Sequence, residues 1–178
     1  LVYSDAGASV IEISHRSPQY TAVVDSARSL LRELLGIGDD WSILFLQSGA
    51  SLQFYQAPLN FLTGQTCADY VITGAWAKKA HKEASMIGDA RIAASSADSN
   101  FSYIPDTSTW KVSEDAAYLH MTSNNTIYGT QIKGDPDVGV PLICDASSDF
   151  LSRPIDMSKY GLMYAGAQKN IGPAGATV

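Results

Sequence analysis

Short apolar runs alternate with amphipathic stretches along this chain, and this alternation limits the folds open to it more than any other feature. Apolar side chains recur three and four positions apart over residues 23–35, a spacing that predicts a helix ended by Gly36. Residues 41–47 form a mostly apolar run, which favours a strand buried on both faces.

The same alternation continues to residue 165. We expect further strands at residues 69–73, 91–94, 118–122, 141–146 and 162–165, and helices at residues 52–62 and 75–87. Strands that alternate with helices are joined by right-handed crossovers and form a mainly parallel sheet. The sequence therefore predicts a three-layer α/β domain. Such a sheet binds ligands beyond the carboxyl ends of its strands, so residues at those ends are the candidates for chemistry.

Composition argues against several classes of protein. A general nucleic-acid binder would gather lysine and arginine on one face, whereas the formal net charge here is -6. No apolar run approaches the roughly 20 residues needed to span a bilayer, so no membrane partner is expected. Cys67 and Cys144 lie in apolar stretches without the spacing of metal ligands. They predict buried free thiols, no metal site and a cytoplasmic location.

Both ends of the sequence suggest a piece of a longer protein. Leu1 is not an initiator methionine, and residues 1–10 lack the features of a signal peptide. A further strand is predicted to begin at residues 175–178, where no turn follows it. We therefore expect residues 1–178 to form one domain of a larger chain.

A turn rich in small residues follows the strand predicted at residues 41–47. Residues 47–53 read Gln-Ser-Gly-Ala-Ser-Leu-Gln and lead into a predicted helix. Backbone N–H groups and the positive end of the helix dipole would suit a phosphate there. Small residues also serve tight turns, so this motif alone does not decide between the two roles. It is not a Walker loop, because no Gly-Lys-Ser/Thr follows.

Two more strand ends carry reactive side chains. Asp145 ends an apolar run, where a carboxylate needs a cationic partner such as a protonated ring nitrogen. A cap for the following turn explains this aspartate equally well. Lys169 lies among Ala, Gly and Pro after the last predicted strand, where desolvation would leave more of its amine neutral and nucleophilic. A lysine whose charged end reaches solvent also fits this position.

Together the three strand ends predict one site for pyridoxal phosphate (PLP). The turn would anchor the phosphate, and Asp145 would keep the pyridine nitrogen protonated. Lys169 would form a Schiff base with the aldehyde and then move the proton of the substrate. Trp76, just after the strand at residues 69–73, could stack on the ring, although a core aromatic explains it as well when it is considered alone.

Several segments resemble the phosphoserine aminotransferase family, within class V of the PLP-dependent aminotransferases. The clearest are residues 145–161 and residues 164–175, the second reading Tyr-Ala-Gly-Ala-Gln-Lys-Asn-Ile-Gly-Pro-Ala-Gly. Residues 13–17, 49–54 and 71–77 match the family as well. The resemblance therefore covers nearly the whole chain.

This resemblance implies the PLP-binding large domain of a fold type I aminotransferase, without the N-terminal segment and the smaller carboxyl-terminal domain. It implies transfer of an amino group between L-glutamate and 3-phosphohydroxypyruvate, giving O-phospho-L-serine and 2-oxoglutarate. That reaction belongs to serine biosynthesis and, in many bacteria, to pyridoxine biosynthesis. The resemblance further implies a homodimer with active sites at the interface.

The resemblance also implies roles for individual residues. Lys169 would carry the cofactor, and Asp145 would partner its pyridine nitrogen. Arg16, with His15, would bind the acidic group of the substrate, since arginine pairs with carboxylate and phosphate alike. Ser48 stands where many members have Gly, a change that keeps the turn possible. The residues expected to contact the cofactor are Ala50, Ser51, Trp76, Thr126, Asp145, Gln168 and Lys169.

Three other functions stay open at this point. A small-amino-acid aminotransferase or a cysteine desulfurase of class V would share the fold. A desulfurase needs a mobile cysteine, however, which Cys67 and Cys144 do not offer beside predicted strands. A non-catalytic α/β module that binds a phosphate or nucleotide would leave Asp145 and Lys169 without roles. A non-catalytic interaction domain would not need the intact set of residues.

Overall fold

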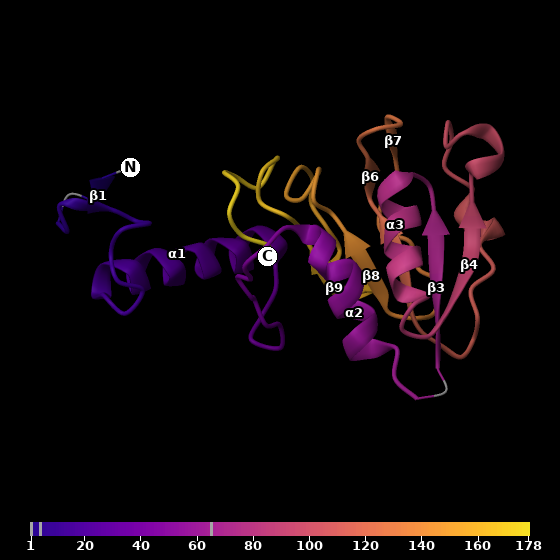
Figure 1. The fold of residues 1–178 in the computed structure, drawn as a ribbon, viewed down its shortest axis with the longest axis horizontal. Coiled ribbons are helices and arrows are strands. Elements are labelled where there is room, and N and C mark those ends of the chain that lie inside the picture. Colours follow the sequence, from indigo (N-terminus) through magenta and orange to yellow (C-terminus); the bar gives the residue numbers. More distant parts are fainter. Residues whose placement is uncertain (1, 4, 65) are drawn as a thin grey trace. The chain divides into compact units, whose positions relative to one another are not determined.

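A computed structural model describes residues 2–3, 5–64 and 66–178 of the chain (Figure 1). The chain divides into two compact units, residues 1–43 and residues 44–178. The first unit holds one long helix, and the second holds a parallel sheet. Among the residues described, no helix is both long enough and apolar enough to cross a membrane.

Helix α1 (Pro18–Leu35) has 18 residues and is the long helix of the first unit. The Ser17 hydroxyl caps its start by accepting a hydrogen bond of 3.2 Å from the Tyr20 N–H. Gly36 ends the helix in the left-handed conformation, with a φ of 63°. The helix predicted at residues 23–35 is therefore confirmed, and it begins earlier than predicted. The strands of this unit, which pair antiparallel, are β1 (Val2–Tyr3) and β2 (Ala8–Ser9).

The sheet of the second unit has five strands in the order β4-β3-β5-β8-β9, and all neighbours in it are parallel (Figure 1). Parallel neighbours require a crossover between strands, which the alternation in the sequence supplies. The predicted mainly parallel α/β fold is confirmed. The strands are β3 (Cys67–Ile72), β4 (Asp89–Ser95), β5 (Ala116–Thr122), β8 (Leu142–Asp145) and β9 (Tyr160–Tyr164). A separate antiparallel pair consists of β6 (Asn124–Asn125) and β7 (Thr130–Gln131).

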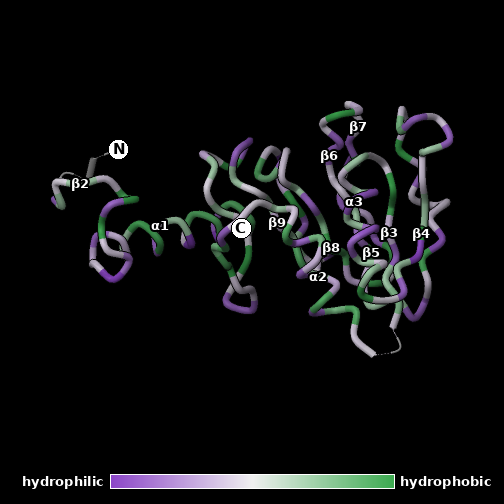
Figure 2. The backbone as a smooth tube through the Cα atoms, viewed as in Figure 1, coloured by the Kyte–Doolittle hydropathy of each residue, from purple (hydrophilic) through white to green (hydrophobic). Residues whose placement is uncertain are grey.

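The central strands of the sheet, β3, β5 and β8, are buried on both faces. Helices α2 (Gln53–Phe61) and α3 (Ala75–Ala84), both predicted, pack on one face, where Phe54 joins Tyr70 and Ile143 in one apolar cluster. Burial on both faces explains the near-continuous apolar runs, and Figure 2 shows hydrophobic residues along β3. Alternate strand positions point to the opposite face and are also buried: Val71, Leu119, Met121 and Cys144.

The strand predicted at residues 41–47 is wrong. Leu46 pairs its backbone with Thr177 through two hydrogen bonds, of 2.7 Å and 2.8 Å, and this is an isolated bridge rather than a ladder. Residues 175–178, where another strand was predicted to begin, also make only isolated bridges, because Thr177 pairs with Leu46 and with Gly166. A strand needs a run of paired neighbours, and Leu44 is 60% exposed instead of buried.

A hydrogen-bonded aromatic cluster lies inside the sheet. The hydroxyls of Tyr70 and Tyr118 share a hydrogen bond of 2.8 Å, and His120 Nε2 shares one of 2.8 Å with the Tyr164 hydroxyl. The Tyr70 ring stacks on the His120 ring, with centroids 5.0 Å apart. Burial disfavours the imidazolium and lowers the pKa of His120 from 6.5 to about 3. The native protein therefore holds His120 neutral at ordinary pH.

Replacing His120 by phenylalanine should reduce the acid sensitivity of the fold. Between pH 6.5 and about pH 3 the unfolded chain binds a proton at His120 that the native protein excludes. The free energy of unfolding therefore falls as the pH falls through this range, by about 1.4 kcal/mol per pH unit from this group. Urea unfolding between about pH 7 and 5 measures the slope. Equal slopes in the parent protein and His120→Phe would contradict a buried, neutral histidine.

Candidate active site

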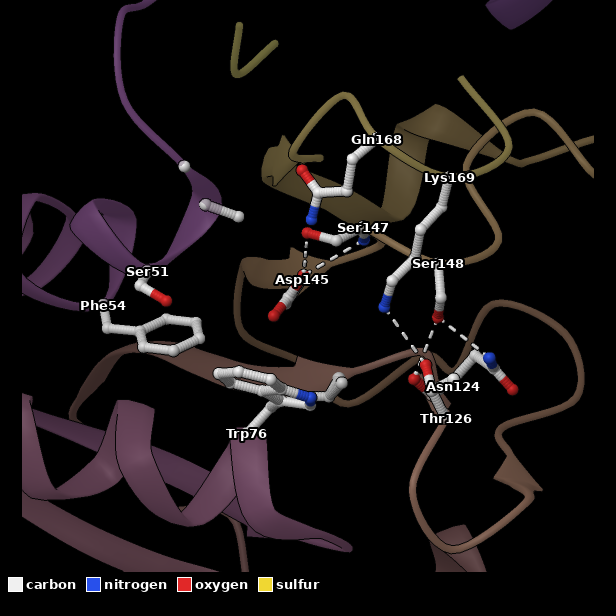
Figure 3. Close-up of a pocket in the computed structure, with 13 residues that line it drawn as sticks. Ser51, Phe54, Trp76, Asn124, Thr126, Asp145, Ser147, Ser148, Gln168 and Lys169 are labelled. Carbon is white, nitrogen blue, oxygen red and sulfur yellow. Dashed lines mark hydrogen bonds between the residues drawn. The ribbon is translucent and has the colours of Figure 1, made fainter. Parts of the chain in front are cut away.

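A pocket lies at the carboxyl ends of strands β5, β8 and β9, beside the first turn of α3 (Figure 3). Its lining comes from segments that are far apart in the sequence and meet at one edge of the parallel sheet. This is the edge at which such sheets bind ligands. The residues expected to contact the cofactor all line it: Ala50, Ser51, Trp76, Thr126, Asp145, Gln168 and Lys169.

Asp145 is the last residue of β8, and its side chain is buried. Its Oδ1 accepts two hydrogen bonds from Ser147, one from the backbone N–H at 3.0 Å and one from the hydroxyl at 2.6 Å. Its other oxygen points into the pocket, toward the Trp76 ring (Figure 3). Burial raises the pKa of this carboxyl, whereas the bonds from Ser147 and the charge of Lys169 lower it. A cationic group in the pocket would favour the ionised form further.

Lys169 reaches the pocket from the irregular segment after β9. Its Nζ donates a hydrogen bond of 3.3 Å to Thr126 Oγ1 (Figure 3). Its charge acts on Asp145, so the amine and the carboxylate border the same space. The sequence predicts a desolvated lysine, and this is wrong for the chain described here, in which Lys169 is exposed. The exposure follows from its place beyond the end of the strand rather than within the sheet.

Trp76 lies in the first turn of α3, 38% exposed, with its ring bordering the pocket (Figure 3). The turn before it requires Gly74, because a Cβ there would lie 2.5 Å from Asn125 Oδ1, closer than two such atoms can pack. Asn125 is buried, and its Nδ2 donates a hydrogen bond of 3.0 Å to Thr73 Oγ1. This close approach fixes where α3 begins and thereby places Trp76.

The turn at residues 48–51 brings backbone N–H groups to the pocket. Gly49 precedes the 3-10 turn η1 (Ala50–Leu52), which runs directly into α2. Ala50 packs against Gly166, where an added Cβ would lie 3.2 Å from both the Cβ and the N of Ala50. The start of a helix attracts anions through its N–H groups and its dipole. The turn therefore suits a phosphate group.

The structure adds pocket residues that the sequence does not single out: Phe54, Thr122, Asn124, Ser147 and Ser148. Asn124 Nδ2 donates to Ser148 Oγ at 2.8 Å, a bond that joins β6 to the turn after β8. The sequence could have indicated Ser147, because a serine two residues after an aspartate can donate a hydrogen bond to the carboxylate. Phe54 and Thr122 carry no such signal, because each fits an ordinary helix or strand position.

The chemical groups that line the pocket fit the cofactor predicted from the sequence. Thr122 lines the pocket, and its buried Oγ1 has no hydrogen-bond partner within the described part of the chain. An unpartnered buried hydroxyl costs roughly 1–3 kcal/mol, so a polar ligand atom beside it would be stabilising. A buried carboxylate, an amine, an aromatic face and an N–H cradle are the groups that a phosphorylated pyridine aldehyde requires.

His15 and Arg16 belong to the first unit, where both are exposed in the turn before α1. The Arg16 backbone N–H donates a hydrogen bond of 3.3 Å to Ser14 Oγ. Their role in binding an acidic substrate stays a prediction.

Both cysteines are buried free thiols, as predicted. Burial raises the pKa of Cys67 and of Cys144, which disfavours the reactive thiolate in each. Neither side chain is therefore the exposed, mobile thiol that a cysteine desulfurase needs.

Comparison with known proteins places the chain in a family. It belongs to the class-V aminotransferases, whose family model matches residues 2–178. It is 53% identical over 179 residues to the phosphoserine aminotransferase of Alkalihalobacillus alcalophilus, a match that covers 100% of this chain and 50% of that protein.

Solved structures of similar proteins agree with this assignment. One, on radiation damage of the Schiff base in phosphoserine aminotransferase, matches with a TM-score of 0.95 at 53% identity, covering 98% of this chain and 49% of the other. PLP-bound phosphoserine aminotransferase from Trichomonas vaginalis matches with a TM-score of 0.89 at 42% identity, covering 98% of this chain and 52% of the other. The chain thus spans about half the length of the relatives that it matches.

Ser48→Gly should stabilise the protein. Ser48 adopts a φ of 80°, a conformation that costs roughly 1–3 kcal/mol for a residue other than glycine. Glycine relieves that strain. It also makes the unfolded chain more flexible, which lowers the free energy of unfolding by roughly 0.4–1 kcal/mol. We therefore expect a net gain of about 1 kcal/mol in the free energy of unfolding, measured in urea.

Ser85→Gly is the matched control for Ser48→Gly. Ser85 has a φ of -64°, which needs no glycine. The same substitution there should therefore lower the free energy of unfolding. A loss of stability in Ser48→Gly as large as that in the control would contradict the strained turn.

Proposed function

We propose that this chain is the cofactor-binding part of a phosphoserine aminotransferase. The reaction transfers an amino group between L-glutamate and 3-phosphohydroxypyruvate, with PLP as the cofactor, and yields O-phospho-L-serine and 2-oxoglutarate. One observation carries the proposal: a buried carboxylate, Asp145, and an amine, Lys169, line the same pocket. Similarity to the PLP-bound enzyme from Trichomonas vaginalis supports the choice of cofactor.

Four kinds of noncovalent contact hold the cofactor in this proposal. The N–H groups of Ala50 and Ser51, the Ser51 hydroxyl and the Gln168 amide bind the phosphate. Trp76 stacks on the ring, and Thr126 donates or accepts a hydrogen bond at its edge. Asp145 bonds the pyridine nitrogen. Its ionised form is favoured by that positive charge, which offsets the effect of burial.

Bound in this pocket, PLP supplies an electron sink for the bonds at the α-carbon of the substrate. Asp145 holds the proton on the pyridine nitrogen, because an ionised carboxylate stabilises the charged ring. Lys169 would hold the cofactor covalently until the substrate amine displaces it. The Nζ freed in that exchange would take the proton from the substrate α-carbon and deliver it to C4′ of the cofactor. Thr126 orients the amine through the hydrogen bond at 3.3 Å.

Proton transfer by a lysine requires its neutral form, and exclusion of water favours that form. Since Lys169 is exposed in this chain, we infer that other parts of the whole protein cover it. A homodimer with active sites at its interface would supply such a cover from the partner subunit.

Arg16, with His15, binds the acidic group of the substrate in this proposal. A guanidinium donates paired hydrogen bonds to the side-chain carboxylate of glutamate and to the phosphate of phosphoserine in the same bidentate geometry. This requirement distinguishes the proposed enzyme from an aminotransferase for small amino acids. The protein would act in the cytoplasm, in serine biosynthesis and, in many bacteria, in pyridoxine biosynthesis.

A phosphate- or nucleotide-binding module without catalysis is the second candidate. It would use the turn at residues 48–51, but it would leave a carboxylate buried at a strand end without a cationic ligand. A buried, unpaired carboxylate is costly. The PLP site therefore explains Asp145 and the module does not.

Arg16→Ala, made in the whole protein that contains this chain, tests the proposed function. Loss of a bidentate, charge-assisted contact should raise the KM for glutamate and for O-phosphoserine at least about tenfold each. The dissociation constant of PLP should change by less than about twofold, since the cofactor makes no contact with Arg16 in this proposal. Steady-state kinetics and a PLP titration measure the two effects.

Arg16→Lys is the matched control, because it keeps the charge without the fork of donors. The KM of Arg16→Lys for each substrate should lie between that of the parent protein and that of Arg16→Ala. An equal loss of PLP and substrate in Arg16→Ala would contradict the assignment of Arg16. A PLP-loaded parent protein that transfers no amino group from either substrate would contradict the proposed function.

A further inference from the structure

The hydroxyl of Ser147 joins two segments of the pocket. It donates a hydrogen bond of 2.6 Å to Asp145 Oδ1, and it accepts one of 3.1 Å from the Gly166 backbone N–H. Gly166 lies just before the residues that carry Gln168 and Lys169 toward the pocket. One hydroxyl therefore links the carboxylate at the end of β8 to the lysine segment that follows β9.

The local part of this contact is a common consequence of the spacing Asp-x-Ser. Asp106 Oδ1 accepts from the N–H and the hydroxyl of Ser108, at 2.9 Å and 2.6 Å. Asp156 Oδ1 accepts from the same two groups of Ser158, at 3.1 Å and 2.6 Å. Both aspartates cap short 3-10 turns at the surface. A cap alone therefore accounts for a serine at this spacing.

The Ser147 turn differs from these two in its surroundings. Its aspartate is buried rather than exposed, so the hydrogen bonds act where water competes little. Its hydroxyl also bonds a different strand end, through Gly166. Gly166 in turn packs against Ala50, where a Cβ would meet Ala50 at 3.2 Å. The carboxylate, the lysine segment and the phosphate turn thus meet around this one serine.

The two bonds from Ser147 also set the direction of the carboxylate. They occupy Oδ1, so the other oxygen of Asp145 is the one that points into the pocket (Figure 3). They favour the ionised carboxylate, because each is donated to its charged form, and so they lower the pKa of Asp145 against the effect of burial. Without the hydroxyl, the carboxylate would lose a charge-assisted bond and the lysine segment would lose an anchor.

We propose that Ser147 is a positioning residue that fixes the carboxylate of Asp145 and the segment of Lys169 relative to each other, and so preorganises the pocket for the cofactor. This inference rests on the proposed function, because it concerns the same PLP site. Ser147 acts through Asp145 and Gly166 rather than by touching the reacting atoms. Its removal weakens cofactor binding before any chemistry takes place.

The test is the affinity of the whole protein, stripped of cofactor, for PLP, measured by titration of visible absorbance. Ser147→Ala should raise the dissociation constant about tenfold, equivalent to about 1.4 kcal/mol. Ser147→Thr keeps the hydroxyl, so its dissociation constant for PLP should stay within about threefold of that of the parent protein. Ser108→Ala removes the same local hydrogen bond at an exposed site and should leave PLP affinity within about twofold.

The melting temperature of the cofactor-free protein is the second readout. Ser147→Ala should lower it more than Ser108→Ala, because it removes the bond accepted from Gly166 as well as the bond donated to Asp145. Both variants should still be folded at the temperature of the titration. The inference is overturned if Ser147→Ala binds PLP as tightly as the parent does, or if Ser147→Thr is as weak as Ser147→Ala. A parent protein that binds no PLP would instead overturn the proposed function.

Discussion

The parallel register of strands β5, β8 and β9 is the constraint on which the site depends. Thr122 pairs with Asp145, and Asp145 pairs with Tyr164, so the carboxyl ends of three strands lie side by side. The segments that follow these strands then leave the sheet at the same edge. Thr126, Asp145 and Lys169 therefore border one pocket, and Ala50 joins them because it packs against Gly166.

The site keeps several features that lower stability. A buried carboxylate, a Thr122 hydroxyl that has no hydrogen-bond partner among the described residues and a strained Ser48 backbone all lie in or beside one pocket. Each is costly in the free protein and is compensated only in part by neighbours such as Ser147. Strained and unpaired groups gather where a protein binds or reacts. In the proposed enzyme, the cofactor supplies the partners that the polar groups lack.

Much of the fold follows from the sequence because the central strands of the sheet are buried on both faces and are therefore apolar runs between amphipathic helices. The failure at residues 41–47 has a physical reason. An apolar run becomes a strand only when a neighbour pairs with it along its length, and Leu46 finds that partner at Thr177 alone. The sequence of one segment does not show which other segments will pair with it.

Prediction of the site depended on two kinds of information. The strand ends single out Asp145 and Lys169 by residue type, and the family resemblance adds residues such as Gln168 and Thr126. The role of Ser147 was not predicted, because it depends on a contact with Gly166 that only the fold creates. The exposure of Lys169 was not predicted for a similar reason, because the burial of a segment depends on what covers it rather than on its own residues.

Borohydride reduction followed by peptide mapping tests the central claim most directly. Reduction of the whole protein saturated with PLP should fix the cofactor irreversibly to one lysine, and the account predicts that lysine to be Lys169. The pocket offers a single amine beside a single buried carboxylate among its lining residues. A pyridoxyl group on another lysine, or none in a folded and saturated sample, would contradict the account.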